Sequence, residues 1–240
     1  MNSNLFITKI SLDKDKIDDY TKYPFNIPIV KNFIELKIDS PVTFLVGENG
    51  IGKSTFIEAI AINCKMNPEG GSNNFTLSTK DTHSKLSEYM HVSFYNHPKT
   101  RYFLRAESFY NVATTIDNDE LNEYYKFESL HECSHGESFI KLIKNRFYDH
   151  GLYILDEPEA ALSPNRQLTL LCLIDELVKK GSQFIIATHS PILISYRNGK
   201  ILNLDDNFKE IKYEDTDIYQ TYKMYLDNYE HMQDKLFESD

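Results

Sequence analysis

The chain has 240 residues, of which 41% are apolar, and a formal net charge of −10, a composition that fits one globular domain and excludes a disordered chain. Proteins that bind nucleic acid by neutralising phosphates usually carry a basic surface. This chain has a negative net charge instead, so nucleic-acid contact is possible but not through bulk charge. No apolar run approaches the roughly 18 residues of a membrane helix, no signal peptide is evident and the three cysteines lack metal-ligand spacing, so we expect a cytoplasmic protein with no membrane span.

Short apolar runs alternate with helical patterns along the chain. Buried strands that alternate with helices predict an α/β fold with a mainly parallel sheet flanked by helices on both faces. The stretch 66–84 is rich in Gly, Ser, Asn and Thr and is typical of a loop. Strands are expected at 5–12, 33–38, 42–46, 92–95, 102–106, 152–155, 184–187 and 201–204, and helices at 53–63, 137–148 and 167–179.

No linker divides the chain, so we expect a single domain over residues 1–240. It contains a short helical and loop insertion at approximately 64–134 and a C-terminal helical tail at 213–240. Four tyrosines of this tail follow helical spacing, which predicts a helix that packs them on the domain. They are Tyr219, Tyr222, Tyr225 and Tyr229.

The segment 47–54, with the sequence GENGIGKS, matches the P-loop pattern at every fixed position and lies between an expected strand and an expected helix. Glycines let backbone N–H groups surround phosphates, and the helix N-terminus adds a positive end. In this pattern Lys53 reaches the β- and γ-phosphates of ATP, Ser54 coordinates Mg²⁺, and Thr55 adds a contact near the α-phosphate. The residues expected to bind the nucleotide are Asn49, Gly50, Gly52, Lys53, Ser54 and Thr55.

Two acidic residues, Asp156 and Glu157, directly follow the apolar run 152–155. They would lie at the carboxyl end of a strand, where α/β proteins bind ligands. An apolar run that ends in Asp-Glu is common, but downstream of a P-loop it gains a specific interpretation. Asp156 would hold the Mg²⁺ shell, and Glu157 would polarise an attacking water.

Two further motifs have both a structural and a functional interpretation. His189 follows the apolar run 184–187 and is either a structural residue or a hydrogen-bond donor to the γ-phosphate or to the water beside Glu157. Ser134 and Glu137 have the spacing of a capping box at a helix start. The same helix N-terminus also suits an anion site. The sequence leaves both pairs of alternatives open.

Together these motifs resemble the ABC ATPase superfamily over most of residues 33–204. The arrangement is most similar to the SMC/RecF-like branch and to small bacterial proteins described as predicted ATPases. The resemblance implies an ABC-type ATPase head, with an additional antiparallel β portion near the N-terminus. It implies hydrolysis of ATP to ADP and phosphate with Mg²⁺, with Lys53, Glu157 and His189 as catalytic residues. It also implies an ATP-dependent homodimer, in which Ser134 and Gly136 of one subunit meet the γ-phosphate held by the other.

The chain departs from the family pattern at several places. Cys133 and His135 replace the leucine and the first glycine of the usual signature, and Glu159 replaces an aspartate. A loop glutamine is not evident; Glu107 is the candidate for its metal-side role, with a surface strand as the alternative. The long coiled-coil arms of SMC proteins are missing as well, because the segment between Thr55 and Ser134 lacks heptads.

Adenine stacking in this family usually falls to an aromatic residue upstream of the P-loop. Tyr23 and Phe25 are candidates, with core packing as the alternative.

The resemblance favours an ATP-driven dimerisation switch in a nucleic-acid maintenance or phage-defence assembly, with a further protein partner. One alternative is the nucleotide-binding subunit of an ABC transporter, which the unusual signature and the missing glutamine disfavour. The other is a non-hydrolysing ATP sensor or scaffold, which the presence of Glu157 disfavours.

Overall fold

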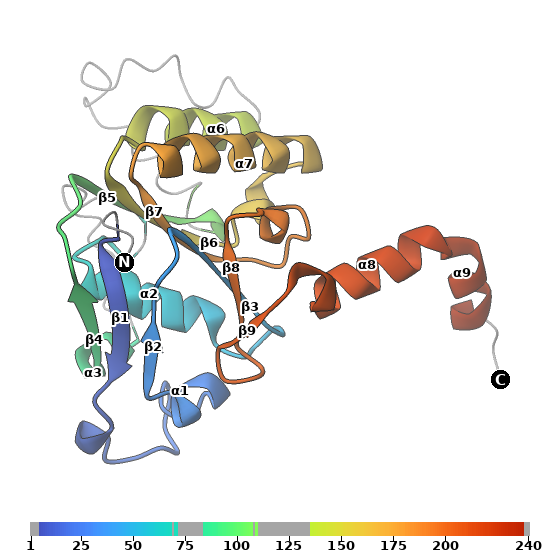
Figure 1. The fold of residues 1–240 in the computed structure, drawn as a ribbon. Helices are drawn as coiled ribbons and strands as arrows, with labels where there is room; N and C mark the ends of the chain where they lie inside the picture. Colours follow the sequence, from blue (N-terminus) through green and yellow to red (C-terminus); the bar gives the residue numbers. More distant parts are fainter. Residues whose placement is uncertain (1–4, 69, 72–83, 108, 110–134, 238–240) are drawn as a thin grey trace.

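The computed structural model describes residues 5–68, 70–71, 84–107, 109 and 135–237 (Figure 1). Its strands are β1 (Ile7–Leu12), β2 (Glu35–Lys37), β3 (Val42–Val46), β4 (Met90–Phe94), β5 (Thr100–Arg105), β6 (Gly151–Asp156), β7 (Gln183–Ala187), β8 (Lys200–Asn203) and β9 (Lys209–Ile211). Its helices are α1 (Pro28–Asn32), α2 (Lys53–Asn63), α3 (Leu86–Tyr89), α6 (His135–Arg146), α7 (Pro164–Lys179), α8 (Asp217–Asp227) and α9 (Tyr229–Phe237).

The larger sheet has the strand order β5-β6-β7-β3-β8-β9. Neighbouring strands from β5 to β8 pair in parallel, and only β9 pairs antiparallel with its neighbour, at the edge. Every residue of β3, β6 and β7 is buried, as expected for strands that are covered on both faces. The prediction of an α/β fold with a mainly parallel sheet is confirmed.

The two faces of this sheet pack into separate hydrophobic clusters, because side chains alternate along each strand. In β7, for example, Ile185 belongs to the cluster that contains α2, whereas Phe184 and Ile186 belong to the cluster that contains α6 and α7. Helix α2 therefore covers one face, and helices α6 and α7 cover the other (Figure 1).

A second, antiparallel sheet with the order β2-β1-β4 lies on the α2 side of the larger sheet. The expected antiparallel portion near the N-terminus is thus confirmed. Strand β2 is shorter than the predicted strand 33–38, because α1 extends to Asn32 and Phe33 is its C-cap residue. The side chain of Gln183 joins the two sheets: its Oε1 accepts hydrogen bonds from the backbone N–H groups of Phe6 and Ile7, at 2.8 and 2.9 Å.

The region 64–134, expected as an insertion, is described in part. Its described strands each extend one of the two sheets: β4 pairs with β1, and β5 pairs with β6. Most of the loop expected at 66–84 lies outside the described residues.

The C-terminal tail forms the expected helices, but the prediction that its tyrosines pack on the domain is wrong. Of the four, only Tyr219 is half-buried. Its ring packs edge-on against the ring of Tyr213, with 4.7 Å between the ring centroids. Tyr222, Tyr225 and Tyr229 are exposed. Figure 1 shows the reason: α8 and α9 extend away from both sheets, so only the first turn of α8 reaches the core, through Ile218. In the described part of the chain, none of the helices combines the length and apolarity needed to cross a membrane.

Candidate functional site

The glycine-rich loop between β3 and α2 has backbone conformations that glycine alone adopts readily. Gly50 has φ +82° and Gly52 has φ +107°, both in the left-handed region. A Cβ atom at Gly52 would lie only 2.4 Å from the Cγ2 atom of Ile27. The loop therefore requires glycine at Gly52 for its conformation and for its packing. It leads directly into the N-terminus of α2, which begins at Lys53.

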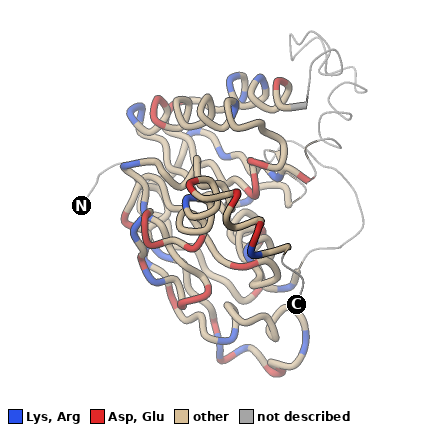
Figure 2. Tube along the Cα trace, turned by 90° about the vertical axis from the view of Figure 1, so that its right-hand side faces the viewer, with Lys and Arg blue, Asp and Glu red and all other residues tan. Residues whose placement is uncertain are grey.

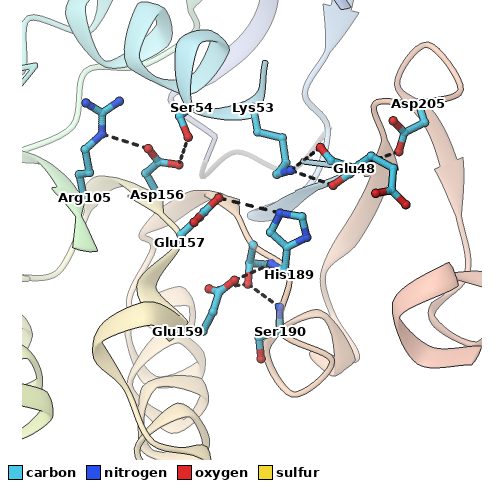
Figure 3. A network of polar contacts seen from close by, with 12 residues as sticks. Glu48, Lys53, Ser54, Arg105, Asp156, Glu157, Glu159, His189, Ser190 and Asp205 are labelled. Carbon is cyan, nitrogen blue, oxygen red and sulfur yellow. Dashed lines mark hydrogen bonds and ion pairs between the residues drawn. The ribbon is translucent and has the colours of Figure 1, made fainter. Parts of the chain in front are cut away.

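The side chain of Lys53 turns back over this loop. Its Nζ donates hydrogen bonds to the backbone oxygens of Gly47 and Glu48, at 2.7 and 2.9 Å (Figure 3). Burial lowers the pKa of Lys53, although nearby carboxylates, first Glu157 and then Asp205, oppose this effect. Asp205 also anchors the loop, since its Oδ2 accepts a hydrogen bond from the backbone N–H of Glu48 at 2.9 Å.

Ser54 and Asp156 come together from α2 and from the carboxyl end of β6. The Ser54 hydroxyl donates a hydrogen bond to Oδ1 of Asp156 at 3.2 Å. Burial raises the pKa of Asp156, and the neighbouring Arg105 opposes this rise. A hydroxyl and one carboxylate oxygen fit Mg²⁺, which prefers oxygen ligands and takes few of them from the protein. Mg²⁺ does not need a larger set of protein ligands. Within the described ranges, no group of three or more His, Cys, Asp or Glu side chains is placed to hold a metal ion.

The sequence alone does not point to two residues of this polar network, Arg105 and Glu58. Arg105, at the end of β5, donates from Nε to Oδ2 of Asp156 and from Nη2 to Oε2 of Glu58, each at 3.0 Å. Glu58 belongs to α2. In this segment the sequence predicts a functional role for Glu107 alone. The signal that identifies Arg105 is the strand pairing, which sets Arg105 opposite Asp156, and a single sequence does not reveal that register.

Glu157 has a left-handed backbone, with φ +48° and ψ +51°. This conformation costs a non-glycine residue about 1–2 kcal/mol. It is held by the backbone, since the Glu157 N–H donates to the Ala187 carbonyl at 2.9 Å. The side chain is 43% exposed, and it points between Asp156 and His189 (Figure 3).

His189 lies at the start of the loop that follows β7, two residues after Ala187. Its Nε2 is 3.9 Å from Oε1 of Glu157, and this buried nitrogen has no hydrogen-bond partner among the described residues. Burial lowers the pKa of His189, and the positive charge of Lys53 lowers it further. The imidazole is therefore neutral at pH 7, and one ring nitrogen is available to a ligand or a water.

Glu159, singled out in the sequence only as a departure from a pattern, holds the loop of His189 in place. Its two carboxylate oxygens accept hydrogen bonds from the Thr188 hydroxyl at 2.7 Å and from the backbone N–H of His189 at 2.5 Å. Burial raises the pKa of Glu159, and these hydrogen bonds oppose the rise. The turn after Glu157 and the loop of His189 are thereby joined.

The remaining candidates lie at the periphery. Glu107 is exposed and follows β5 in a helical rather than an extended conformation; it lines a cleft of about 670 Å³ together with Ser54 and Asp156. Phe25 is buried and contacts Tyr89 edge-on at 4.7 Å, which is core packing. Tyr23 is exposed instead, and its hydroxyl lies 3.2 Å from the hydroxyl of Thr55.

The serine-glycine motif is described only in part, because Ser134 lies outside the described residues. Gly136 is in the first turn of α6. A Cβ atom there would lie 2.8 Å from Arg166 Cδ and 3.0 Å from the carbonyl oxygen of Ala161. Gly136 thus packs against the turn that follows Glu157 in its own chain.

Comparisons with known proteins give a family match for part of the chain and a fold match for most of it. Residues 133–194 match a family described as the AAA ATPase domain. This range contains the acidic pair and His189 but not the glycine-rich loop. No protein of curated function matches the sequence.

Several solved structures resemble this one at low sequence identity. A protein described as a metal-chelate type ABC transporter, in an inward-facing conformation, is 15% identical, with coverage of 92% of this chain and 90% of that chain and a TM-score of 0.50. An ATP-binding cassette of an ABC transporter is 14% identical, with coverage of 91% and 99% and a TM-score of 0.49. The SMC head domain from Thermotoga maritima is 14% identical, with coverage of 82% and 95% and a TM-score of 0.45. The first of these likenesses shows that the chain has the fold of ABC-type ATPases.

Proposed function

We propose that the protein binds ATP and hydrolyses its β–γ phosphoanhydride with Mg²⁺. The observation that carries this proposal is the meeting of two segments about 100 residues apart in the chain. Ser54, which directly follows Lys53, contacts Asp156, which directly precedes Glu157. A phosphate-binding loop and an acidic strand end are the two parts that phosphoryl transfer requires.

Each residue has a distinct role in this proposal. The backbone N–H groups of Asn49, Gly50 and Gly52 surround the phosphates. Lys53 exchanges its two carbonyl acceptors for β- and γ-phosphate oxygens. Ser54 and Asp156 hold Mg²⁺, which when bound neutralises charge on those oxygens. Thr55 adds a contact near the α-phosphate, and Glu107 is a further candidate on the metal side.

Glu157 acts as the general base that takes a proton from the attacking water. Its carboxylate approaches His189, whereas that of Asp156 contacts Ser54 and Arg105, so the two acidic groups serve different partners. His189, neutral at pH 7, donates a hydrogen bond to the γ-phosphate or to the water. The reaction thus rests on positioning and charge stabilisation, as in other phosphoryl transfers.

Turnover assays test this proposal directly. Phosphate release from ATP is measured with Mg²⁺ and with EDTA, for the native protein and for Glu157→Gln. We expect magnesium-dependent release that falls by on the order of 10²-fold in the variant, while ATP binding remains. A variant that turns over at the native rate would exclude Glu157 as the base, and His189 would be the next candidate.

We further propose that ATP brings two copies together. Gly136 belongs to helix α6, which lies on the opposite face of the large sheet from α2. We therefore do not expect Gly136 to contact a nucleotide bound at the glycine-rich loop of the same subunit. In a two-fold dimer, Ser134 and Gly136 of each subunit would meet the γ-phosphate of the other. The hydroxyl and the open helix N-terminus supply the donors.

The biological output is proposed from the resemblance: a cytoplasmic switch in a nucleic-acid maintenance or phage-defence assembly, with a further protein partner. Figure 2 shows Lys and Arg residues interspersed with Asp and Glu residues along the described part of the chain, and this mixture does not by itself favour nucleic-acid contact. A transporter subunit and a non-hydrolysing sensor remain the alternatives. A pull-down from native cells with Glu157→Gln and ATP would identify a permease, a nucleic-acid enzyme or no partner.

A further inference from the structure

The side chain of Arg105 links the acidic end of β6 to the middle of helix α2. It donates from two different nitrogens to two carboxylates, Asp156 on one side and Glu58 on the other, each at 3.0 Å. All three side chains are largely buried, with exposures of 17% for Arg105, 13% for Glu58 and 3% for Asp156. Charge-assisted contacts in such a setting are strong and hold their geometry.

The contact divides the two oxygens of Asp156 between two partners. Oδ2 accepts from Arg105, and Oδ1 accepts from the hydroxyl of Ser54. A carboxylate held at one oxygen cannot rotate without breaking that contact, so the other oxygen keeps facing Ser54. The fork of the guanidinium is suited to this, because its planar nitrogens reach two fixed acceptors at once.

From this geometry we infer that Arg105 is a positioning residue for the magnesium site, with Glu58 as its second anchor. The inference rests on the proposed function, because it concerns how Asp156 is presented to Mg²⁺. In this role Arg105 acts through Asp156 and would contact neither the metal nor the nucleotide. Residues that orient metal ligands typically contribute 10- to 100-fold to metal affinity.

The two acceptors also explain the choice of arginine over lysine. A lysine ammonium carries the same charge on a flexible stem, and it does not present two nitrogens in a fixed plane. Arg105→Lys therefore separates charge from geometry. If the charge alone mattered, this variant would behave as the native protein does.

The experiment measures the Mg²⁺ concentration at which half of the magnesium-dependent binding of a fluorescent ATP analogue is reached. For Arg105→Gln we expect this concentration to rise by about tenfold or more, while binding of the analogue in EDTA stays unchanged. Glu58→Gln should move it in the same direction by less. Combined with Arg105→Gln it should add nothing, because the two residues act as one unit.

Arg101→Gln is the matched control. Arg101 lies on the same strand, four residues earlier, and donates to the backbone oxygen of Cys64 at 3.0 Å. Its loss removes a half-buried arginine from β5 without touching Asp156. We expect the native Mg²⁺ requirement in this variant.

The outcomes separate the inference from the proposed function. If the native protein binds the analogue without any dependence on Mg²⁺, the proposed function fails. If the native protein depends on Mg²⁺ but folded Arg105→Gln requires the same concentration, Arg105 is only a cross-link between β5, β6 and α2, and the inference is wrong. Loss of binding in EDTA would overturn it too, since Arg105 would then contact the nucleotide. Should Arg105→Gln not fold, Arg105→Lys and Glu58→Gln provide the same two readouts.

Discussion

The Nε2 atom of His189 lies 3.9 Å from Oε1 of Glu157, and it is buried without a hydrogen-bond partner among the described residues. The two side chains come from adjacent strands, β6 and β7, and face each other across the site (Figure 3). A gap of this size is too long for a direct hydrogen bond. It lets both groups contact one water or one phosphate oxygen, which is the basis of the first prediction.

We expect turnover to fall as the pH drops towards the pKa of His189, which lies below 6.5, the ordinary pKa of histidine. Burial and Lys53 place the pKa of His189 below that value, so the neutral imidazole persists until the pH falls further. His189→Asn should lower turnover by about 10- to 100-fold and remove this limb of the pH profile. His91→Asn, at an exposed histidine, serves as the control.

The same lowered pKa affects stability with a definite sign. Between the folded pKa of His189 and 6.5 the folded protein binds fewer protons than the unfolded chain, so the free energy of unfolding rises with pH through this window. His189→Asn should flatten that rise in urea titrations at different pH values. A native protein whose unfolding free energy does not change there would contradict the buried, neutral state.

Lys53→Ala should abolish ATP binding, because a single ammonium supplies the point charge at the β- and γ-phosphates. Titration with a fluorescent ATP analogue measures this effect. Lys179→Ala is the control, since Lys179 is an exposed lysine at the end of α7 whose ammonium pairs with Asp175. Equal affinity in the two variants would mean that the glycine-rich loop does not bind nucleotide.

The left-handed backbone of Glu157 predicts an unusual order of stability among its variants. Glu157→Gly and Glu157→Ala both remove the carboxylate, but only glycine adopts this conformation without a penalty. We expect the free energy of unfolding to be higher for Glu157→Gly than for Glu157→Ala, by about 1–2 kcal/mol. Both variants should lose turnover. Chemical denaturation of the pair checks this order. The reverse order would show that the backbone relaxes once the side chain is gone.

Light scattering tests the dimer. Glu157→Gln with ATP and Mg²⁺ should have twice the mass of the protein without nucleotide, and Ser134→Arg should prevent this while ATP still binds. If Ser134 only caps a helix, Ser134→Arg would cost roughly 1 kcal/mol of stability and leave assembly unchanged. A Glu157→Gln protein that stays monomeric at tens of micromolar would instead indicate a different partner.

The parts of the site that the sequence predicts are those built from contiguous motifs. The glycine-rich loop carries its own conformational signature, and the acidic pair follows the run 152–155 of four apolar or aromatic residues, so the sequence alone predicts both. Strand positions were predicted for the same reason, because buried strands read as short apolar runs.

Features that depend on three-dimensional pairing were not predicted. Arg105 acquires its partners only through the register of β5 with β6, and Glu159 only through the approach of the loop at His189. For the C-terminal tail, by contrast, the sequence predicted contacts that the structure does not have. Tyrosine spacing predicts a helix but not its direction, and the residues of α8 beyond Tyr219 are exposed because the helix extends away from both sheets.

The three hydrogen bonds of Gln183 have a consequence for the order of folding. They join β1, at the beginning of the chain, to a residue more than 170 positions later. During synthesis the first strand therefore has to wait until β7 has emerged before its buried backbone groups find these partners. Contacts of such long range slow folding. Gln183→Leu should therefore lower the free energy of unfolding, because it leaves the backbone N–H groups of Phe6 and Ile7 and the backbone oxygen of Ile7 without these partners.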